Sequence, residues 1–191
     1  MANMASVAYA IEGNKESLEK IKDAILKAIL QKEHWGDEWK ACINLGFTEK
    51  ELDDKRLGGQ IPEEPDLIDG VLKFYAEERW GLQDFEELLI QKFPDINVYW
   101  IVEECGCEVY CTNDEEGKYF PQRYWVDTAQ DDVYASEYFN DEKSMWEWLN
   151  KKYGVKSMEE VEAWNANYEE TGNECENFIY IHEFTIEGNN D

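Results

Sequence analysis

Apolar and polar residues alternate most clearly over residues 72–128, where the pattern predicts a strand, a helix and then a meander of strands. Every second residue is apolar at residues 96–103, as expected for a strand with one buried face. That face is formed by Ile96, Val98, Trp100 and Val102. The helix before it carries an apolar stripe formed by Phe85, Leu88, Leu89 and Phe93. We therefore expect this helix to lie on one face of an antiparallel sheet.

The pattern in the N-terminal part predicts a strand at residues 6–12 and a helix at residues 15–31, with Asn14 as the helix cap. Residues 34–70 differ in character, because a short helix opened by a capping box at Thr48 is followed by an acidic loop with two prolines. We interpret residues 34–70 as a helical and loop insertion.

The C-terminal part predicts a polar connection after residue 128, followed by two helices. Asn140 is placed to cap the first helix and Gly154 to stop it, while Ser157 opens the second. Residues 178–187 are largely apolar on both faces, which is typical of a strand in the centre of a sheet.

This order of elements predicts an α+β fold. The simplest arrangement is a ferredoxin-like antiparallel sheet with helices packed on one face. A chain of 191 residues is long enough for one full core. We therefore expect one α+β domain over residues 1–191, with residues 34–70 inserted in it.

Four short sequence motifs also favour this fold, because they carry a resemblance to a known family. They are Ile11-Glu12-Gly13 before a long helix, Trp80 after a strand, Phe93-Pro94-Asp95 at a helix end, and Glu103-Glu104-Cys105-Gly106 at a strand end. With them the chain resembles an uncharacterised family of plasmid- and phage-borne bacterial proteins with a ferredoxin-like domain. The resemblance covers the first strand and helix and residues 72–127. It implies a fold and a mobile-element origin, and it brings no activity and no site residues.

Charge narrows the classes of partner. Forty-four acidic against 18 basic residues give a net charge of −26. Such a surface repels nucleic acid and anionic membranes and attracts basic proteins. We find neither a long apolar run nor a signal peptide in the sequence, so we expect a cytoplasmic protein without a membrane span. We expect a basic or aromatic-recognising protein partner and no direct contact with nucleic acid.

Three of the five cysteines, Cys105, Cys107 and Cys111, are close together in the sequence. Thiolates are zinc ligands, but structural zinc sites usually combine four ligands, and no histidine is near. Packing in the core or at a sheet edge therefore outweighs metal or redox chemistry, and we expect no cofactor and no metal. The pattern leaves metal binding by these cysteines open.

Catalytic motifs are missing from the sequence. The two histidines, His34 and His182, are far apart, and His182 has no orienting partner that the sequence reveals. Carboxylate pairs such as Glu77-Glu78, Glu103-Glu104 and Asp131-Asp132 carry little information, because neighbours on a strand point apart. The acidic turn at residues 113–117 lacks the ligand spacing of an EF-hand, and phosphate-binding glycine loops are absent.

The aromatic residues favour a binding role. Trp146 and Trp148 are two positions apart on a predicted helix, so we expect one of them to point away from its core. The preferred hypothesis is a non-enzymatic accessory protein that contacts another protein. The alternatives are a DNA mimic that inhibits a nucleic-acid-binding protein, and a small enzyme using carboxylates with His182 or Cys105. The sequence does not define an oligomeric state.

Overall fold

The computed structural model describes residues 3–31, 36–79, 81–170 and 176–187, with backbone only at 167–170. Trp80 and His34 lie outside the described residues. The chain forms two compact units, which we describe separately: unit 1 comprises Met1–Glu115 and Glu187–Asp191, and unit 2 comprises Glu116–Ile186. A division into compact units does not test domain boundaries. A single domain over residues 1–191 with an insertion at 34–70 therefore stays a prediction.

Unit 1 contains an antiparallel sheet in which the strands follow the order β2-β3-β1-β4-β5. The N-terminal strand β1 pairs antiparallel with both β3 and β4. The β3-α4-β4 segment is therefore a crossover between two parallel strands that leaves room for β1 between them. The strands are β1 (Met4–Glu12), β2 (Asp66–Ile68), β3 (Val71–Arg79), β4 (Asn97–Glu104) and β5 (Val109–Thr112).

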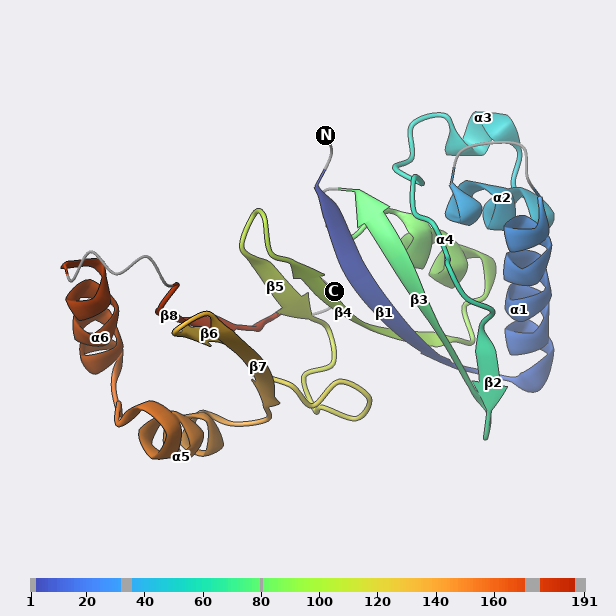
Figure 1. The fold of residues 1–191 in the computed structure, drawn as a ribbon. Helices are drawn as coiled ribbons and strands as arrows, with labels where there is room; N and C mark the ends of the chain where they lie inside the picture. Colours follow the sequence, from blue (N-terminus) through green and yellow to red (C-terminus); the bar gives the residue numbers. More distant parts are fainter. Residues whose placement is uncertain (1–2, 32–35, 80, 171–175, 188–191) are drawn as a thin grey trace. The chain divides into compact units, whose positions relative to one another are not determined.

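Helices cover one face of this sheet, with α1 and α2 clearly visible beside β1 and β3 (Figure 1). The helices are α1 (Lys15–Leu30), α2 (Asp37–Asn44), α3 (Glu49–Leu52) and α4 (Phe85–Lys92). Asn14 caps α1 by accepting a hydrogen bond from the Ser17 N–H, and Thr48 forms the expected capping box with Glu51. The helix predicted at residues 15–31 and the start of the short helix at Thr48 are therefore confirmed. The short helix α3 is only one turn long and ends at Leu52.

The core of unit 1 confirms the central prediction from periodicity. The four stripe residues of α4 and its C-cap are buried in the same cluster as Val98, Trp100 and Val102 of β4. Tyr9 of β1 is stacked on Phe74 of β3 at a ring-centroid distance of 4.7 Å within this cluster. The amphipathic helix thus packs on the apolar side of the sheet, because that contact removes both apolar faces from water.

Unit 2 has its own three-stranded antiparallel sheet, in the order β7-β6-β8. One face packs on its two helices through a second core cluster that includes Val126, Met145, Leu149 and Ile179. The elements of this unit are β6 (Tyr124–Gln130), β7 (Val133–Phe139), α5 (Glu142–Tyr153), α6 (Met158–Glu170), β8 (Phe178–Glu183) and β9 (Thr185–Ile186).

Several predictions about unit 2 are wrong in detail. The stretch after residue 128, expected to be a polar connection, contains the end of β6, a turn and the whole of β7. The turn residues Asp131 and Asp132 both have positive φ angles, 50° and 62°. Aspartate tolerates this conformation better than most residues, so no glycine marks the turn. The strand expected at the centre, β8, lies at an edge, because β6 is the strand with two neighbours. Asp141 rather than Asn140 caps α5, while Gly154 ends it as expected.

The fold class is therefore confirmed as α+β at the level of two sheets with helices packed against them. The strand β2 lies inside the stretch that the sequence assigns to a loop. None of the described helices has the length and apolar character that a membrane span requires.

Candidate binding sites

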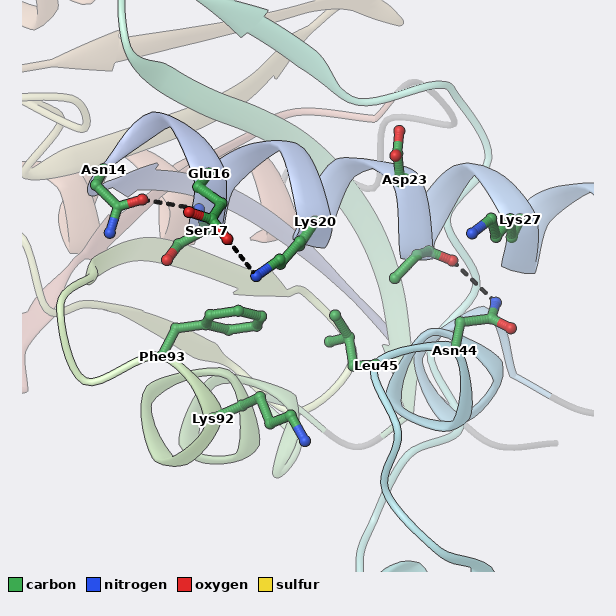
Figure 2. A pocket seen from close by; sticks show the side chains of 11 residues that line it. Asn14, Glu16, Ser17, Lys20, Asp23, Lys27, Asn44, Leu45, Lys92 and Phe93 are labelled. Atoms are coloured by element: carbon green, nitrogen blue, oxygen red, sulfur yellow. Dashed lines mark hydrogen bonds and ion pairs between the residues drawn. The ribbon is translucent and has the colours of Figure 1, made fainter.

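A cleft of about 670 Å³ opens on the helical side of unit 1. Figure 2 shows α1 along one side, with residues from the ends of α2 and α4 facing it. Three lysines face two acidic side chains there, which makes the cleft locally positive in a strongly acidic chain. The lining residues are Asn14, Glu16, Ser17, Lys20, Asp23, Ala24, Lys27, Asn44, Leu45, Lys92 and Phe93.

Several polar groups of the cleft already have partners within the protein. Lys20 donates to Glu16 at 2.7 Å, and Asn44 Nδ2 donates to a backbone carbonyl of α1 at 3.1 Å (Figure 2). The Lys92 ammonium lies 5.2 Å from the centre of the Phe47 ring. These polar side chains are therefore accounted for by contacts within the protein, and the cleft does not by itself indicate a ligand.

Two glutamates, Glu38 of α2 and Glu78 of β3, are fully buried in unit 1. Glu78 accepts hydrogen bonds from the Tyr9 hydroxyl at 2.5 Å and from the Gln83 N–H at 2.6 Å. Glu38 Oε2 accepts one from the Gly59 N–H at 3.0 Å, whereas Oε1 has no donor among the described residues. The two carboxyl groups also face each other within hydrogen-bonding reach. Glu78 thus has the bonding pattern of a carboxylate, and Glu38 has room for a proton.

The electrostatics agree with one proton shared by this carboxyl pair, Glu38 and Glu78. Burial raises the pKa of Glu38 well above its usual value, and the negative charge of Glu78 raises it further. Burial also raises the pKa of Glu78, although hydrogen bonds from Glu38 and Tyr9 oppose this rise. Two adjacent buried carboxylates cannot both be charged without a large penalty. The pair does not line the cleft, so its evident role is to join α2 and the segment at Gly59 to β3.

A third glutamate, Glu86 of α4, accepts hydrogen bonds from Trp100 Nε1 at 2.6 Å and from Asn113 Nδ2 at 3.3 Å. Burial raises the pKa of Glu86 to about 7, against the lowering effect of the bond from Trp100. This contact fixes the start of α4 on β4 and places a titrating group beside an indole.

The three clustered cysteines differ in their surroundings. Cys111 is buried in β5, as expected, whereas Cys105 and Cys107 are exposed in the turn between β4 and β5. Burial raises the pKa of Cys111 to about 12, and a hydrogen bond to Glu104 raises the pKa of Cys107, so neither is an activated nucleophile. Among the residues the structure describes, no group of three or more His, Cys, Asp or Glu is arranged to hold a metal ion.

Two of the carboxylate pairs singled out in the sequence, Glu77-Glu78 and Glu103-Glu104, lie on strands, whereas Asp131 and Asp132 form the turn between β6 and β7. Glu78 is buried while its neighbour Glu77 is exposed, because they lie on opposite faces of β3. His182 lies on β8 with its ring stacked on Trp125 at 4.9 Å. It does not line the cleft, which is in the other unit.

Aromatic side chains gather on the sheet face of unit 2 that points away from α5 and α6. We call this surface the tyrosine face. Strand alternation and register place nine residues on it in three rows of three. The rows are Tyr138-Trp125-His182, Ser136-Asp127-Tyr180 and Tyr134-Ala129-Phe178.

Exposure shows that this face is not simply a second core. Tyr134, Tyr138 and Tyr180 are 59%, 43% and 54% exposed. The rings contact one another, with Phe178 stacked on Tyr180 at 4.7 Å and Trp125 stacked on Tyr138 at 6.3 Å. Large exposed aromatic groups of this kind are typical of binding surfaces rather than of a solvated sheet.

The expectation for the tryptophans of α5 is wrong. Both Trp146 and Trp148 are half-buried against the second core cluster, and Trp146 Nε1 also donates to Glu142 on its own helix at 3.1 Å. The exposed aromatic surface lies on the sheet instead. The signal in the sequence was the alternate spacing of Tyr134 with Tyr138 and of Phe178 with Tyr180, within stretches interpreted as a loop and a central strand.

Comparison of the chain with known protein families, curated proteins and solved structures gives no match.

Proposed function

We propose that this chain is a non-enzymatic, cytoplasmic binding protein that contacts a positively charged protein through the tyrosine face. The observation that carries the proposal is the exposure of Tyr134, Tyr138 and Tyr180 on one sheet face. Tyrosines of this kind supply large contact areas with little loss of side-chain freedom, which is why they are enriched at protein interfaces.

Charge selects the kind of partner. Unit 2 carries sixteen acidic and six basic residues, so its field attracts a basic partner and repels nucleic acid. Acids also lie beside the face itself, where Asp127 is in its middle row and Glu176 accepts a hydrogen bond from the Tyr134 hydroxyl. A basic protein surface with exposed apolar or planar groups satisfies both the charge and the aromatic rings.

Two related proposals extend this one. The β3-α4-β4 crossover around β1 supports a variant of the ferredoxin-like fold for unit 1, and the sequence resemblance supports a mobile-element origin. A DNA mimic is the version of the main proposal in which the basic partner is a nucleic-acid-binding protein. An enzyme using His182 or Cys105 is not favoured by the cleft of unit 1, because neither residue is among those that line it.

Site-specific photo-crosslinking tests the proposed function. A photoreactive phenylalanine analogue replaces Tyr134 or Tyr180 on the face, and as a control it replaces the exposed Glu162 on α6. We expect both face positions to crosslink the same basic protein in a lysate of the native host, and the control position not to do so. Equal crosslinking from all three positions contradicts the proposal. Competition by duplex DNA identifies the partner as nucleic-acid-binding.

A further inference from the structure

The middle row of the tyrosine face differs from the rows on either side. Asp127 lies opposite Ser136 on one neighbouring strand and opposite Tyr180 on the other. Its same-face neighbour Ala129 is buried and short, and Ser136 is also short. Bulky rings surround these small side chains, so the face is lowest around the Asp127 carboxylate. Cross-strand neighbours are about 5 Å apart and same-face residues about 7 Å apart, so the surrounding rings reach this low area.

The rings around this low area come from all three strands. Trp125 lies one row away from Asp127 on its own strand, while Tyr134 and Tyr138 flank Ser136 on β7. Tyr180 lies directly opposite Asp127 on β8, stacked on Phe178 at a centroid distance of 4.7 Å. Among the residues that the structure describes, no side-chain hydrogen bond or ion pair engages the Asp127 carboxylate. A carboxylate at the base of a group of aromatic rings is therefore available to a cation.

The surroundings reinforce the negative potential at this place. The negative charges of Asp127, Asp132 and Glu176 all act on the Tyr134 hydroxyl, and with its hydrogen bond to Glu176 they raise the pKa of Tyr134. These acids therefore lie close enough to the face to act together on a bound cation. Aromatic ring faces add to this attraction, because their quadrupole is negative above the ring plane.

We propose that the area around Asp127 is a binding site for an arginine side chain of the partner protein, held by the Asp127 carboxylate and flanked by aromatic rings. This inference rests on the proposed function and names the group that the partner supplies. Arginine fits better than lysine because its planar guanidinium can bond a carboxylate through two N–H groups while its faces stack on rings. A nucleic acid does not supply such a cation.

Titration with short synthetic peptides tests the site. The probes are octapeptides of alternating glycine with arginine, lysine or glutamate, followed by calorimetry at 20 mM and 150 mM NaCl. The variants are Asp127→Asn and Tyr180→Ala, with Glu162→Gln on α6 as a control that removes the same charge away from the face. If the peptide binds only through the net charge of the protein, Asp127→Asn and Glu162→Gln weaken its binding equally. If the peptide binds at the proposed site, Asp127→Asn weakens its binding more than Glu162→Gln does.

We expect Asp127→Asn to weaken the arginine peptide about tenfold at 150 mM NaCl and Glu162→Gln to weaken it less than about twofold. We also expect the lysine peptide to bind more weakly than the arginine peptide and the glutamate peptide not to bind. Two results overturn the assignment: equal effects of Asp127→Asn and Glu162→Gln, or equal binding of lysine and arginine.

The peptide results separate this site from the proposed function. If Tyr180→Ala reduces crosslinking of the partner while Asp127→Asn does not affect the peptide, the face is a docking surface without an arginine site. If neither face variant changes crosslinking or peptide binding, the proposed function fails together with the site. Both substitutions are at exposed or half-buried positions, so circular dichroism is expected to show an unchanged fold.

Discussion

Replacing Glu38 by glutamine is expected to remove a pH dependence from the stability of the protein. Glutamine has nearly the shape of a protonated glutamate, so its oxygen can accept from the Gly59 N–H and its amide can donate to Glu78, as the shared proton does. The substitution therefore leaves the hydrogen bonds of the pair in place. It removes only the ability of residue 38 to ionise.

The sign and size follow from proton linkage. The pKa of Glu38 is raised on folding, so the native state binds more protons than the unfolded state, and stability falls as pH rises. The fall begins above the pKa of an unfolded glutamate, about 4.3, and continues until the native pKa is passed, at about 1.4 kcal/mol per pH unit for one proton. Above pH 5 the wild type should therefore lose stability relative to Glu38→Gln with each pH unit, until the native pKa of Glu38 is passed.

Urea unfolding followed by circular dichroism at pH 5, 6, 7 and 8 measures this difference. Glu63→Gln, at an exposed position, is the matched control and should follow the wild type at every pH. Glu78→Gln should instead destabilise unit 1 at every pH by about 1–3 kcal/mol. Tyr9 and Gln83 donate to the two different carboxylate oxygens of Glu78, and the amide nitrogen of glutamine cannot accept the second of these hydrogen bonds. Parallel curves for wild type and Glu38→Gln would refute the shared proton.

Three further predictions test local features. Gly59→Ala should destabilise unit 1 by about 1–3 kcal/mol in urea unfolding, because the new Cβ would clash with the Glu38 side chain. In a Glu38→Ala background, which removes the clashing atoms, the same substitution should cost less stability. Asn14→Ala should cost about 1 kcal/mol through loss of the α1 cap, as read from thermal unfolding, and Asn14→Ser should restore most of it. The tryptophan fluorescence intensity should change with pH with a midpoint near pH 7, as Glu86 ionises beside the Trp100 indole. If the change persists in Glu86→Gln, ionisation of Glu86 is not its cause.

Local patterns were sufficient for α1, for the start of α3, for α4 and for the central strands of unit 1, but they did not define α2. The apolar stripe of α4, the alternation in β4 and the caps at Asn14 and Thr48 each depend on residues a few positions apart, and all are present in the structure. Such features can be predicted because the backbone period and the nearest side chains determine them.

The parts that the sequence did not reveal depend on contacts between distant residues. Glu38 and Glu78 are two of 44 acidic residues, and only the packing of α2 against β3 distinguishes them from the others. The tyrosine face has a similar origin, since Asp127 acquires its ring neighbours from β7 and β8. The turn at Asp131 and Asp132 lacks glycine, so the sequence pattern predicts a connection where β7 lies. That strand supplies three of the nine residues of the face.

The position of β1 between β3 and β4 has a consequence for how the chain folds during its synthesis. The strand β1 pairs on both sides with strands that are synthesised more than 50 residues later. Until β3 and β4 emerge, only the helices α1, α2 and α3 are available to cover the apolar residues of β1. Apolar surface exposed in this way on a nascent chain favours aggregation, which chaperones prevent. Because these pairings are distant in sequence, unit 1 should fold more slowly than its helical content suggests.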